Sequence, residues 1–373
     1  MATPLCPYFG SCGGCTAQHI DYSLQLQNKQ AALARITKGN IEVFSGKEYF
    51  YRNRMDFIFH NNGLGLREKG RWDKIVDVER CVIADERINK TLQEIRSFFK
   101  DPDFFDVKKH SGTFRYAVIR CANETSVSFV LNEKSSRLAE AVEKIKQFAS
   151  ISPVESILVT YVPPESDVSV SSEYFVVKGN DTLDAMYIGK TFAYPIQGFF
   201  QNNHEMAERM QQYAHDLLKK YLTADAHLLD LYAGVGTFGI VNASLFKAVT
   251  LVESVPPAIE AAKRNIQTNE VKNVKAILLD AKQIQKLSVQ QPLYVITDPP
   301  RSGMDQKTIQ TLNAWKPQVI LYISCNPEQL AKDLPKLKNY EIKSAALFDL
   351  FPQTPHSEAV IELVRKSAEE NPQ

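Results

Sequence analysis

The stretch LLDLYAGVGTFG, residues 228–239, decides how the second half of the chain folds. Its first four residues are apolar apart from Asp230, as expected of a buried strand. Gly234, Gly236 and Gly239 follow with the spacing Gly-x-Gly-x-x-Gly, and glycines there let the backbone turn tightly and approach a ligand closely. The stretch therefore predicts a strand, a ligand-binding turn and the start of a helix.

Strands and helices alternate regularly around this turn. We expect a helix over residues 204–221, and strands over 228–231, 249–252, 274–279, 293–297 and 319–324, each followed by a helical or loop segment. This alternation is typical of a doubly wound parallel sheet, in which ligands bind at the carboxyl edge of the strands. Polar residues that end these strands are therefore candidates for one site.

The first half of the chain is organised differently. Helical periodicity is present over residues 20–36 and 135–149, whereas most of 50–196 alternates β-branched and aromatic residues between Asn and Gly turns. This pattern predicts a central mixed α/β domain with a largely antiparallel sheet. We divide the chain into a cysteine-rich segment and helix (1–48), the central domain (49–197), the doubly wound domain (198–366) and a tail (367–373).

The composition, 44% hydrophobic and 23% charged over 373 residues, is that of a globular protein that can bury more than one core. The formal net charge of +1 neither favours nor excludes an anionic partner, because basic residues can gather on one face. Apolar runs such as residues 226–233 are too short to cross a bilayer, and the N-terminus lacks a basic segment followed by an apolar one. We therefore expect no membrane span and a cytoplasmic location.

Acidic residues at the strand ends indicate a nucleoside-containing cofactor. Glu253 ends the strand after the glycine turn, where its carboxylate can accept hydrogen bonds from ribose hydroxyls. The turn alone fits S-adenosylmethionine, a nicotinamide dinucleotide or a purely structural role. Asp230 favours S-adenosylmethionine, because a carboxylate suits a sulfonium and an ammonium group better than a pyrophosphate. Asp280, which ends the next strand, could bind the adenine amino group or simply cap a helix.

Three further residues are expected at the same edge of the sheet. Asp298 ends a strand before two prolines, although an Asp-Pro pair can also merely cap a turn. Cys325 ends the following strand just before a helix, whose N-terminus would lower the pKa of its thiol; the alternative is a small core residue. Glu358 enters an apolar strand, where burial would raise the pKa of its carboxyl group and make it a proton acceptor, unless it lies at the surface.

Four of the six cysteines, Cys6, Cys12, Cys15 and Cys81, lie in the first quarter of the chain. In a reducing compartment such a group is more often a metal site than a set of disulfides. Four thiolates suit tetrahedral zinc and an iron–sulfur cluster equally well, so the spacing does not choose between them.

Several motifs, taken together and in chain order, resemble the RNA uracil-C5 methyltransferases, the family of the RumA, RumB and TrmA enzymes. The motifs are FFQNN (199–203), DPPR (298–301), SCNP (324–327) and FDLFPQTPHSE (348–358), together with Cys6-x5-Cys12-x2-Cys15 and Cys81. The resemblance implies an α/β protein with a Rossmann-like class I S-adenosylmethionine-dependent methyltransferase domain, an N-terminal iron–sulfur segment and a central mixed α/β domain. Two departures are Tyr232-Ala233-Gly234, where several members have Phe-Cys-Gly, and Thr237, where Asn is found.

By this resemblance Cys325 is the nucleophile, Glu358 is the base, and Asp298 binds both the cofactor and the uracil edge. The residues expected to bind the cofactor are Gln201, Tyr232, Gly234, Gly236, Thr237, Glu253, Asp280 and Asp298. The four N-terminal cysteines are implied to hold a [4Fe–4S] cluster in preference to zinc. The chemistry explains the cysteine: C5 of uracil is too weak a nucleophile to take a methyl group from a sulfonium, and thiolate addition at C6 activates it.

RNA is the implied partner, and the protein is expected to be a monomer. Many members carry a small RNA-binding β-barrel, TRAM, before the cysteines, and Cys6 leaves no room for it here. The resemblance is therefore greatest to the RumB-like group, which acts on 23S ribosomal RNA, with the T-loop uridine of transfer RNA as the alternative target. Phe199, Phe200 and Phe351 are candidate surfaces for stacking a flipped base, with core packing as the alternative.

A basic stretch of the central domain is the candidate RNA-binding face, because basic and aromatic residues alternate there. A solvated strand face is the alternative interpretation. The basic residues are Arg52, Arg54, Arg67, Lys69, Arg71 and Lys74, and the aromatic residues are Tyr51, Phe57 and Trp72.

Three rival functions remain to be tested. An NAD-binding iron–sulfur oxidoreductase would give Cys325, Glu358 and the DPPR loop no shared task. A cytosine-C5 enzyme acting on RNA would carry a second cysteine after the double proline, where this chain has Arg301. A non-catalytic RNA-binding protein is the third.

Overall fold

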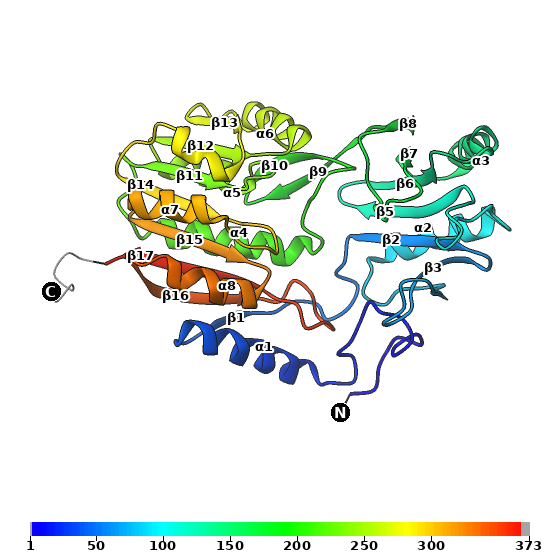
Figure 1. Ribbon diagram of the computed structural model, residues 1–373, viewed down its shortest axis with the longest axis horizontal. Coiled ribbons are helices and arrows are strands. Elements are labelled where there is room, and N and C mark those ends of the chain that lie inside the picture. The colour runs from blue at the N-terminus through cyan, green and yellow to red at the C-terminus, as the bar shows by residue number, and fades with distance from the viewer. Residues whose placement is uncertain (1, 367–373) are drawn as a thin grey trace.

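Two large β-sheets form separate lobes, with a two-stranded ribbon between them (Figure 1). The structure is a computed structural model that describes residues 2–366, so the predicted tail at 367–373 lies outside the described residues. The C-terminal lobe has helices on both faces of its sheet, and the other lobe contains most of residues 50–180.

The C-terminal lobe is built on a mixed eight-stranded sheet. Its strands, in spatial order, are β1 (Glu42–Phe44), β16 (Tyr340–Phe348), β17 (Glu358–Arg365), β15 (Val319–Ser324), β14 (Leu293–Thr297), β11 (His227–Leu231), β12 (Ala248–Glu253) and β13 (Val274–Leu278). The strands from β13 to β15 are parallel, whereas β17 is antiparallel to both of its neighbours. The predicted parallel strands are confirmed, and β17 makes the sheet mixed.

Helices cover both faces of this sheet because alternate strand residues point to opposite sides. Leu228 and Leu251 pack with the helices of one face, and Leu229 and Val252 pack with those of the other. The first face carries α4 (His204–Leu218), α5 (Thr237–Val241), η1 (Ala243–Leu245) and α6 (Pro256–Thr268). The second carries α1 (Tyr22–Thr37), η2 (Ala281–Lys286), α7 (Gln306–Trp315), α8 (Pro327–Asp333) and η3 (Leu334–Lys336). The α/β fold with two helical layers is thus confirmed.

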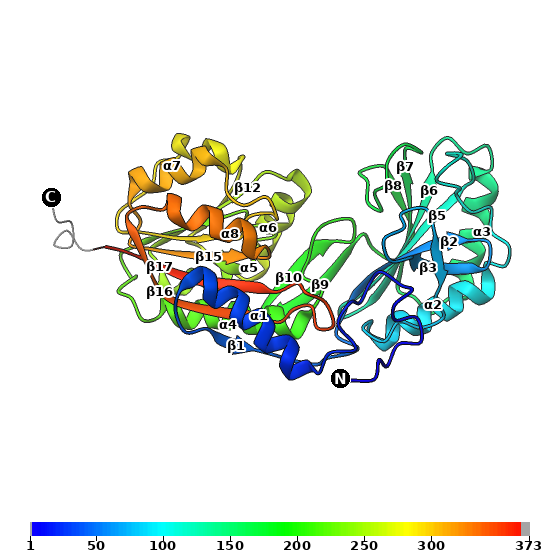
Figure 2. The same ribbon diagram turned by 60° about the horizontal axis from the view of Figure 1, so that its bottom comes forward.

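β1 and α1 belong to this lobe although they lie near the N-terminus. β1 adds an edge strand parallel to β16, and α1 packs against β16 and α8, as Figures 1 and 2 show. Residues 1–48 were predicted as one segment with the cysteines, because a three-residue strand, EVF, carries no periodic signal. The chain therefore enters the C-terminal lobe before it forms the central one.

The central lobe is built on a seven-stranded sheet covered by two helices. Its strands, in spatial order, are β4 (Ile75–Asp77), β3 (Gly63–Arg67), β2 (Arg54–His60), β5 (Phe114–Cys121), β6 (Thr125–Asn132), β7 (Ser156–Val162) and β8 (Tyr174–Lys178). Only β6 and β7 are parallel neighbours, so the predicted largely antiparallel sheet is confirmed. The helices are α2 (Glu86–Phe98), which was not predicted from the sequence, and α3 (Leu138–Ile151).

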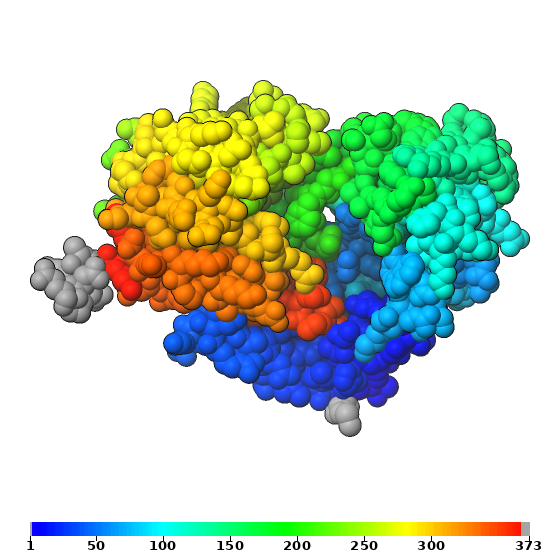
Figure 3. Space-filling model, in the orientation of Figure 1, coloured from blue at the N-terminus to red at the C-terminus, as the bar shows by residue number. Residues whose placement is uncertain are grey.

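A ribbon of β9 (Thr182–Tyr187) and β10 (Lys190–Pro195) connects the two lobes. Asn265 of α6 fixes the ribbon to the C-terminal lobe, since its Oδ1 accepts from the Ala193 amide at 2.8 Å. Asn53 of the central lobe contacts the segment after β10, donating to the carbonyl oxygens of Gln201 and Asn202. Figure 3 shows a hollow between the two lobes.

Among residues 2–366, none of the helices combines the length and the apolar character needed to cross a membrane.

Gly239 gives a test of how closely α5 packs on the sheet. A methyl group at this position would collide with Leu251 and lie 3.2 Å from Val249 Cγ1. We expect Gly239→Ala to lower the free energy of unfolding by about 1–3 kcal/mol through overpacking. Gly39→Ala, where the nearest atom is 3.9 Å away, is the control and should change it little. Urea denaturation followed by circular dichroism measures both, and equal stability of the two variants would contradict the packing argument.

Candidate active site

The glycine turn is held in place by the neighbouring strand. Gly234 and Gly236 have φ angles of 55° and 88°, values that favour glycine. One carboxylate oxygen of Glu253 accepts from the Gly234 amide at 2.9 Å, and the other accepts from the amides of Ser254 and Val255 at 2.7 and 2.9 Å. Glu253 therefore fixes the turn. Its carboxylate oxygens have further lone pairs, which can accept a hydrogen bond from a ligand hydroxyl beside the turn.

Asp230 lies beneath the turn. Its side chain is 1% exposed, and Oδ2 accepts from the Gly239 amide at 2.8 Å. Burial, together with the nearby carboxyl groups of Asp298 and Glu253, raises the pKa of Asp230 to about 8. Asp230 thus supports the first turn of α5 from below.

The other predicted cofactor residues surround the turn to different degrees. Tyr232 follows β11 in a left-handed conformation, with φ of 59°, and is half-buried. Thr237 starts α5, and its hydroxyl oxygen accepts from Gln211 Nε2 at 3.0 Å. Gln201 is half-buried in the segment that leads into α4. Asp280 caps η2, accepting from the Lys282 amide at 2.9 Å, so the structure shows the capping role that the sequence left open.

The strand register brings Asp298, Cys325 and Glu358 to one edge of the sheet. Asp298 follows β14, Cys325 follows β15, and Thr297 lies opposite Tyr322 in the parallel pair of these strands. Glu358 is the first residue of β17, which runs in the opposite direction and places Ala359 opposite Ser324. The start of β17 therefore lies beside the end of β15, and the three predicted catalytic side chains meet.

These side chains influence one another electrostatically. Burial raises the pKa of Asp298 to about 7. Glu358 is 5% exposed, and its burial next to Asp298 raises the pKa of its carboxyl group well above the usual range. Burial raises the pKa of the Cys325 thiol to about 11, and the carboxyl groups of Glu358 and Asp298 act in the same direction.

The prediction that a helix N-terminus lowers the thiol pKa of Cys325 is therefore wrong for this state of the protein. α8 begins at Pro327, and Asn326 caps it by accepting from the amides of Glu328 and Gln329. Desolvation and two neighbouring carboxyl groups outweigh whatever this short helix contributes. The sequence could not weigh these effects, because Glu358 is distant from Cys325 along the chain.

Arg301 is the cation of this site and was not singled out for a role. It lowers the pKa of both Glu358 and Cys325, opposing the effect of burial. Its Nη2 lies 3.1 Å from His356 Nδ1, and its carbonyl oxygen accepts from Asn326 Nδ2 at 2.9 Å. The sequence signal was its place in DPPR, directly after the residues that stop β14.

The predicted aromatic stacking surfaces divide into exposed and buried side chains. Phe199 is 73% exposed, whereas Phe200 is buried and stacks on Tyr194 with ring centroids 4.0 Å apart. Phe57 is fully buried and Tyr51 is 8% exposed, so the proposed RNA stacking role is wrong for both. Trp72 remains exposed, as predicted of a stacking residue.

The predicted basic face is partly neutralised by acidic neighbours. Arg54 pairs with Asp56, Arg67 with Asp167, and Arg71 with Asp73. Arg54 and Arg71 pair with carboxylates two residues further along the chain, whereas the pair of Arg67 follows from the fold, since Asp167 lies on a distant loop that the sequence pattern cannot relate to it.

The four N-terminal cysteines line one cavity of about 500 Å³, together with Arg52, Arg54 and Arg80. Burial and the neighbouring thiols raise the pKa of Cys15 to about 12 and that of Cys81 to about 11. In the part of the chain that the structure describes, no group of three or more His, Cys, Asp or Glu side chains is arranged to hold a metal ion. The predicted iron–sulfur segment therefore stays a prediction.

Comparison with known proteins identifies the family. The sequence profile of the tRNA (uracil-5-)-methyltransferase family matches residues 21–366. The chain belongs to this family. It is 33% identical to a tRNA (uracil(54)-C(5))-methyltransferase of Pyrococcus abyssi over 97% of this chain and 86% of the relative. It is also 33% identical to an uncharacterized RNA methyltransferase of Caldanaerobacter subterraneus subsp. tengcongensis, over 95% of this chain and 83% of that protein.

A solved structure agrees with this assignment. The crystal structure of the P. abyssi tRNA (uracil-54, C5)-methyltransferase in complex with S-adenosyl-L-homocysteine superposes with a TM-score of 0.80 and 30% identity, covering 95% of this chain and 86% of that one. The protein is thus an S-adenosylmethionine-dependent RNA uracil-C5 methyltransferase, as predicted. Of the cofactors that fit the glycine turn, membership of this family therefore indicates S-adenosylmethionine and not a nicotinamide dinucleotide.

The charges around Cys325 predict how its thiol reacts in the free methyltransferase. Asp298→Asn removes a carboxyl group that raises the thiol pKa, so Cys325 should be alkylated by iodoacetamide about tenfold faster near pH 9. Arg301→Leu removes the opposing cation and should slow the reaction. Mass spectrometry of the Cys325 peptide across a pH series measures this. Cys121, buried in the central lobe, is the internal control, and unchanged pH profiles in both variants would contradict the assigned neighbours.

Proposed function

We propose that this methyltransferase forms 5-methyluridine in the T-loop of transfer RNA, at the position equivalent to uridine 54. The similarity that carries the proposal extends over nearly the whole chain, central lobe included, to proteins described as tRNA (uracil(54)-C(5))-methyltransferases. A relative from Pyrococcus horikoshii with the same description is 34% identical over 96% of this chain. Of the two targets that the sequence left open, transfer RNA therefore replaces 23S ribosomal RNA as the main proposal.

In the proposed mechanism Cys325 is the nucleophile. The thiol first loses its proton to solvent. The thiolate sulfur then bonds to C6 of the uracil, and the electrons of the C5–C6 double bond move toward O4, which makes C5 nucleophilic. S-adenosylmethionine, when bound at the glycine turn, supplies the methyl group that C5 takes. Glu358 then removes the proton from C5, the double bond re-forms, and the sulfur leaves C6.

The buried charges suit these roles. A carboxylate in a desolvated site is a stronger base than one in water, which favours proton removal by Glu358. Asp298, the other buried carboxyl group, can accept a hydrogen bond from uracil N3 and fix the base between the nucleophile and the methyl donor. Arg301 stabilises negative charge at the same place, so it favours the thiolate once substrate excludes water.

The cofactor contacts are proposed from their positions around the glycine turn. At Gly234 an added Cβ would meet nothing within 4 Å, which leaves the backbone open to the amino-acid end of S-adenosylmethionine. Gly236 completes the turn with its missing side chain facing Leu251, and Glu253 is placed for the ribose hydroxyls. The remaining side chains proposed to complete the site are Gln201, Tyr232, Thr237, Asp280 and Asp298.

We also propose that Cys6, Cys12, Cys15 and Cys81 hold a [4Fe–4S] cluster. Support comes from the donor set: four thiols and no carboxyl group among the residues lining one cavity, apart from Asp56, which pairs with Arg54. Buried thiols with raised pKa values become thiolates only when a positive centre compensates their charge. Methyl transfer requires no redox step, so the proposed role of this group is structural.

A T-arm RNA hairpin tests both the chemistry and the target. With 5-fluorouridine at the T-loop target position, the enzyme and S-adenosylmethionine should form an adduct on Cys325 that survives denaturation, because fluorine cannot leave C5 as a proton does. Cys325→Ala should form none and lose all methyl transfer, while Cys121→Ala should retain both. A 23S ribosomal RNA fragment that is methylated at least as fast as the hairpin would overturn the transfer RNA target.

The cluster proposal predicts that anaerobically purified protein is brown and contains iron and sulfide. Cys12→Ala should lose the colour and most of the iron, whereas Cys121→Ala should keep both because Cys121 does not line the cavity. Visible absorption and elemental analysis measure this. Colourless protein that contains stoichiometric zinc would contradict the proposal.

A further inference from the structure

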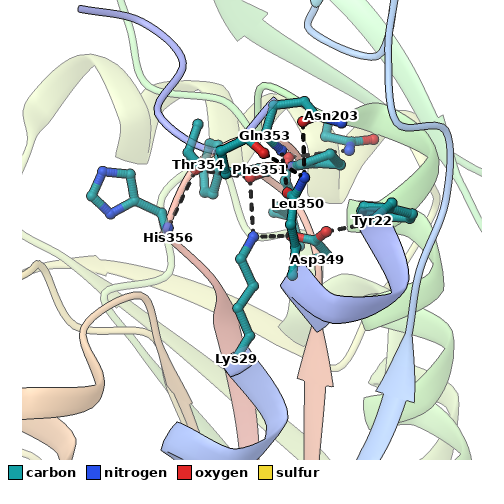
Figure 4. A network of polar contacts seen from close by, with 12 residues as sticks. Tyr22, Lys29, Asn203, Asp349, Leu350, Phe351, Gln353, Thr354 and His356 are labelled. Atoms are coloured by element: carbon teal, nitrogen blue, oxygen red, sulfur yellow. Dashed lines mark hydrogen bonds and ion pairs between the residues drawn. The ribbon is translucent and has the colours of Figure 1, made fainter. Parts of the chain in front are cut away.

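The loop that precedes Glu358 is attached to a distant helix. Residues 349–357 leave β16 after Phe348 and return at Glu358, and these two residues lie opposite each other in the antiparallel pair. The loop therefore ends at the proposed base. Figure 4 shows that it is held by side chains from α1, a helix more than three hundred residues earlier in the chain.

An ion pair fixes the first residue of this loop. Asp349 is fully buried, and its Oδ1 lies 2.7 Å from Nζ of Lys29, which is itself 6% exposed. The other carboxylate oxygen accepts from the Tyr22 hydroxyl at 2.9 Å. Lys29 also donates to the Phe351 carbonyl at 3.2 Å, so one ammonium group contacts two positions of the loop. Burying the charges of Lys29 and Asp349 away from water costs free energy unless the two groups are well paired.

A second attachment lies at Gln353, whose φ of 67° is unusual for a residue other than glycine. Its amide donates to Gln25 Oε1 at 3.1 Å, and its own Oε1 accepts from Gln25 Nε2 at 2.9 Å. Its carbonyl oxygen accepts from the amides of Thr16 and Ala17 at 3.0 and 3.1 Å. This backbone conformation persists because surrounding contacts determine it.

The α1 residues involved share one face of the helix. Tyr22, Gln25 and Lys29 are spaced i, i+3 and i+7, which places them in one row. Both Gln25 and Lys29 are buried, and the Lys29 ammonium group points at the loop, as Figure 4 shows. The Gln25 side chain bonds to Gln353 of the loop and donates to the carbonyl oxygens of Ala17 and Ile20. A helix that served only to cover the sheet would carry apolar residues at these positions, as it does at Leu33.

We propose that Lys29 and Gln25 are positioning residues for the methyltransferase reaction: they hold loop 349–357 so that Glu358 stays in reach of the C5 proton. This inference rests on the proposed role of Glu358 as the base. Neither residue touches the reacting atoms. Their contribution should therefore affect the elimination step and spare the earlier addition of Cys325 to uracil.

The experiment separates these two steps in Lys29→Met. Addition is measured as adduct formation with 5-fluorouridine T-arm RNA, and elimination as release of methylated product from unmodified T-arm RNA. We expect addition close to the wild-type rate, elimination slowed about 100-fold, as for a base displaced by about 1 Å, and a methylated covalent complex that accumulates on unmodified RNA. Lys29→Arg, which keeps the charge, should recover much of the elimination rate.

Two controls make the result specific. Lys263→Met removes a lysine that lies 2.7 Å from Glu260 in an exposed pair on α6, and it should leave both steps unchanged. Asp349→Asn removes the other charge of the ion pair and keeps the shape of the buried side chain. It should show the pattern expected of Lys29→Met, and it replaces Lys29→Met in the test if the latter folds poorly. Binding of S-adenosylhomocysteine confirms that each variant is folded.

Different outcomes overturn different statements. If Glu358→Gln accumulates no covalent complex on unmodified RNA, the proposed role of Glu358 fails. If Glu358→Gln accumulates the complex but Lys29→Met and Asp349→Asn do not, only the positioning role fails. Addition and elimination that fall in parallel, or loss of S-adenosylhomocysteine binding in both variants, would show that the ion pair serves stability alone and would also overturn the inference.

Discussion

The active site depends on β17, a strand that is antiparallel to both of its neighbours. Parallel strands bring their carboxyl ends to one edge, which explains Asp298 and Cys325, but a residue at the start of a parallel strand would lie at the opposite edge. Because β17 is antiparallel to β15, its first residue, Glu358, arrives beside Cys325. The proposed base and the proposed nucleophile, which are separated along the chain, thereby meet at one edge of the sheet.

This placement puts two carboxyl groups and a thiol together in a poorly solvated space. Charging all three would be costly, since burial and mutual repulsion both oppose it, and Arg301 offsets only part of the cost. The free enzyme therefore favours a protonated thiol, which also limits side reactions of the sulfur. In the proposed mechanism the thiolate forms in the substrate complex, where the enolate accepts the charge that the thiolate brings.

The sequence predicted the parts of the site that rest on local pattern. The glycine turn, the strand-ending acids and the cysteine before α8 each carry a short signal, and the structure places them at one edge as expected. What the sequence could not supply was the interaction between distant segments. Arg67 looks like a free cation until Asp167 is seen beside it, and the pKa of Cys325 rises through residues that are not its neighbours in sequence. Likewise, strand β1 is too short to be recognised before β16 is there to pair with it.

The N-terminal segment illustrates the same point at a larger scale. Composition set residues 1–48 apart because of their cysteines, yet the segment is attached to the proposed catalytic loop at both ends. Thr16 and Ala17, directly after Cys15, donate to the Gln353 carbonyl, and Phe44 of β1 accepts from the Asp349 amide at 2.9 Å. A group that orders Cys15 would therefore also order the loop before Glu358, through three successive residues and without touching substrate. The cysteine cavity and the proposed methyl-transfer site are therefore connected by backbone hydrogen bonds, and the connection is structural.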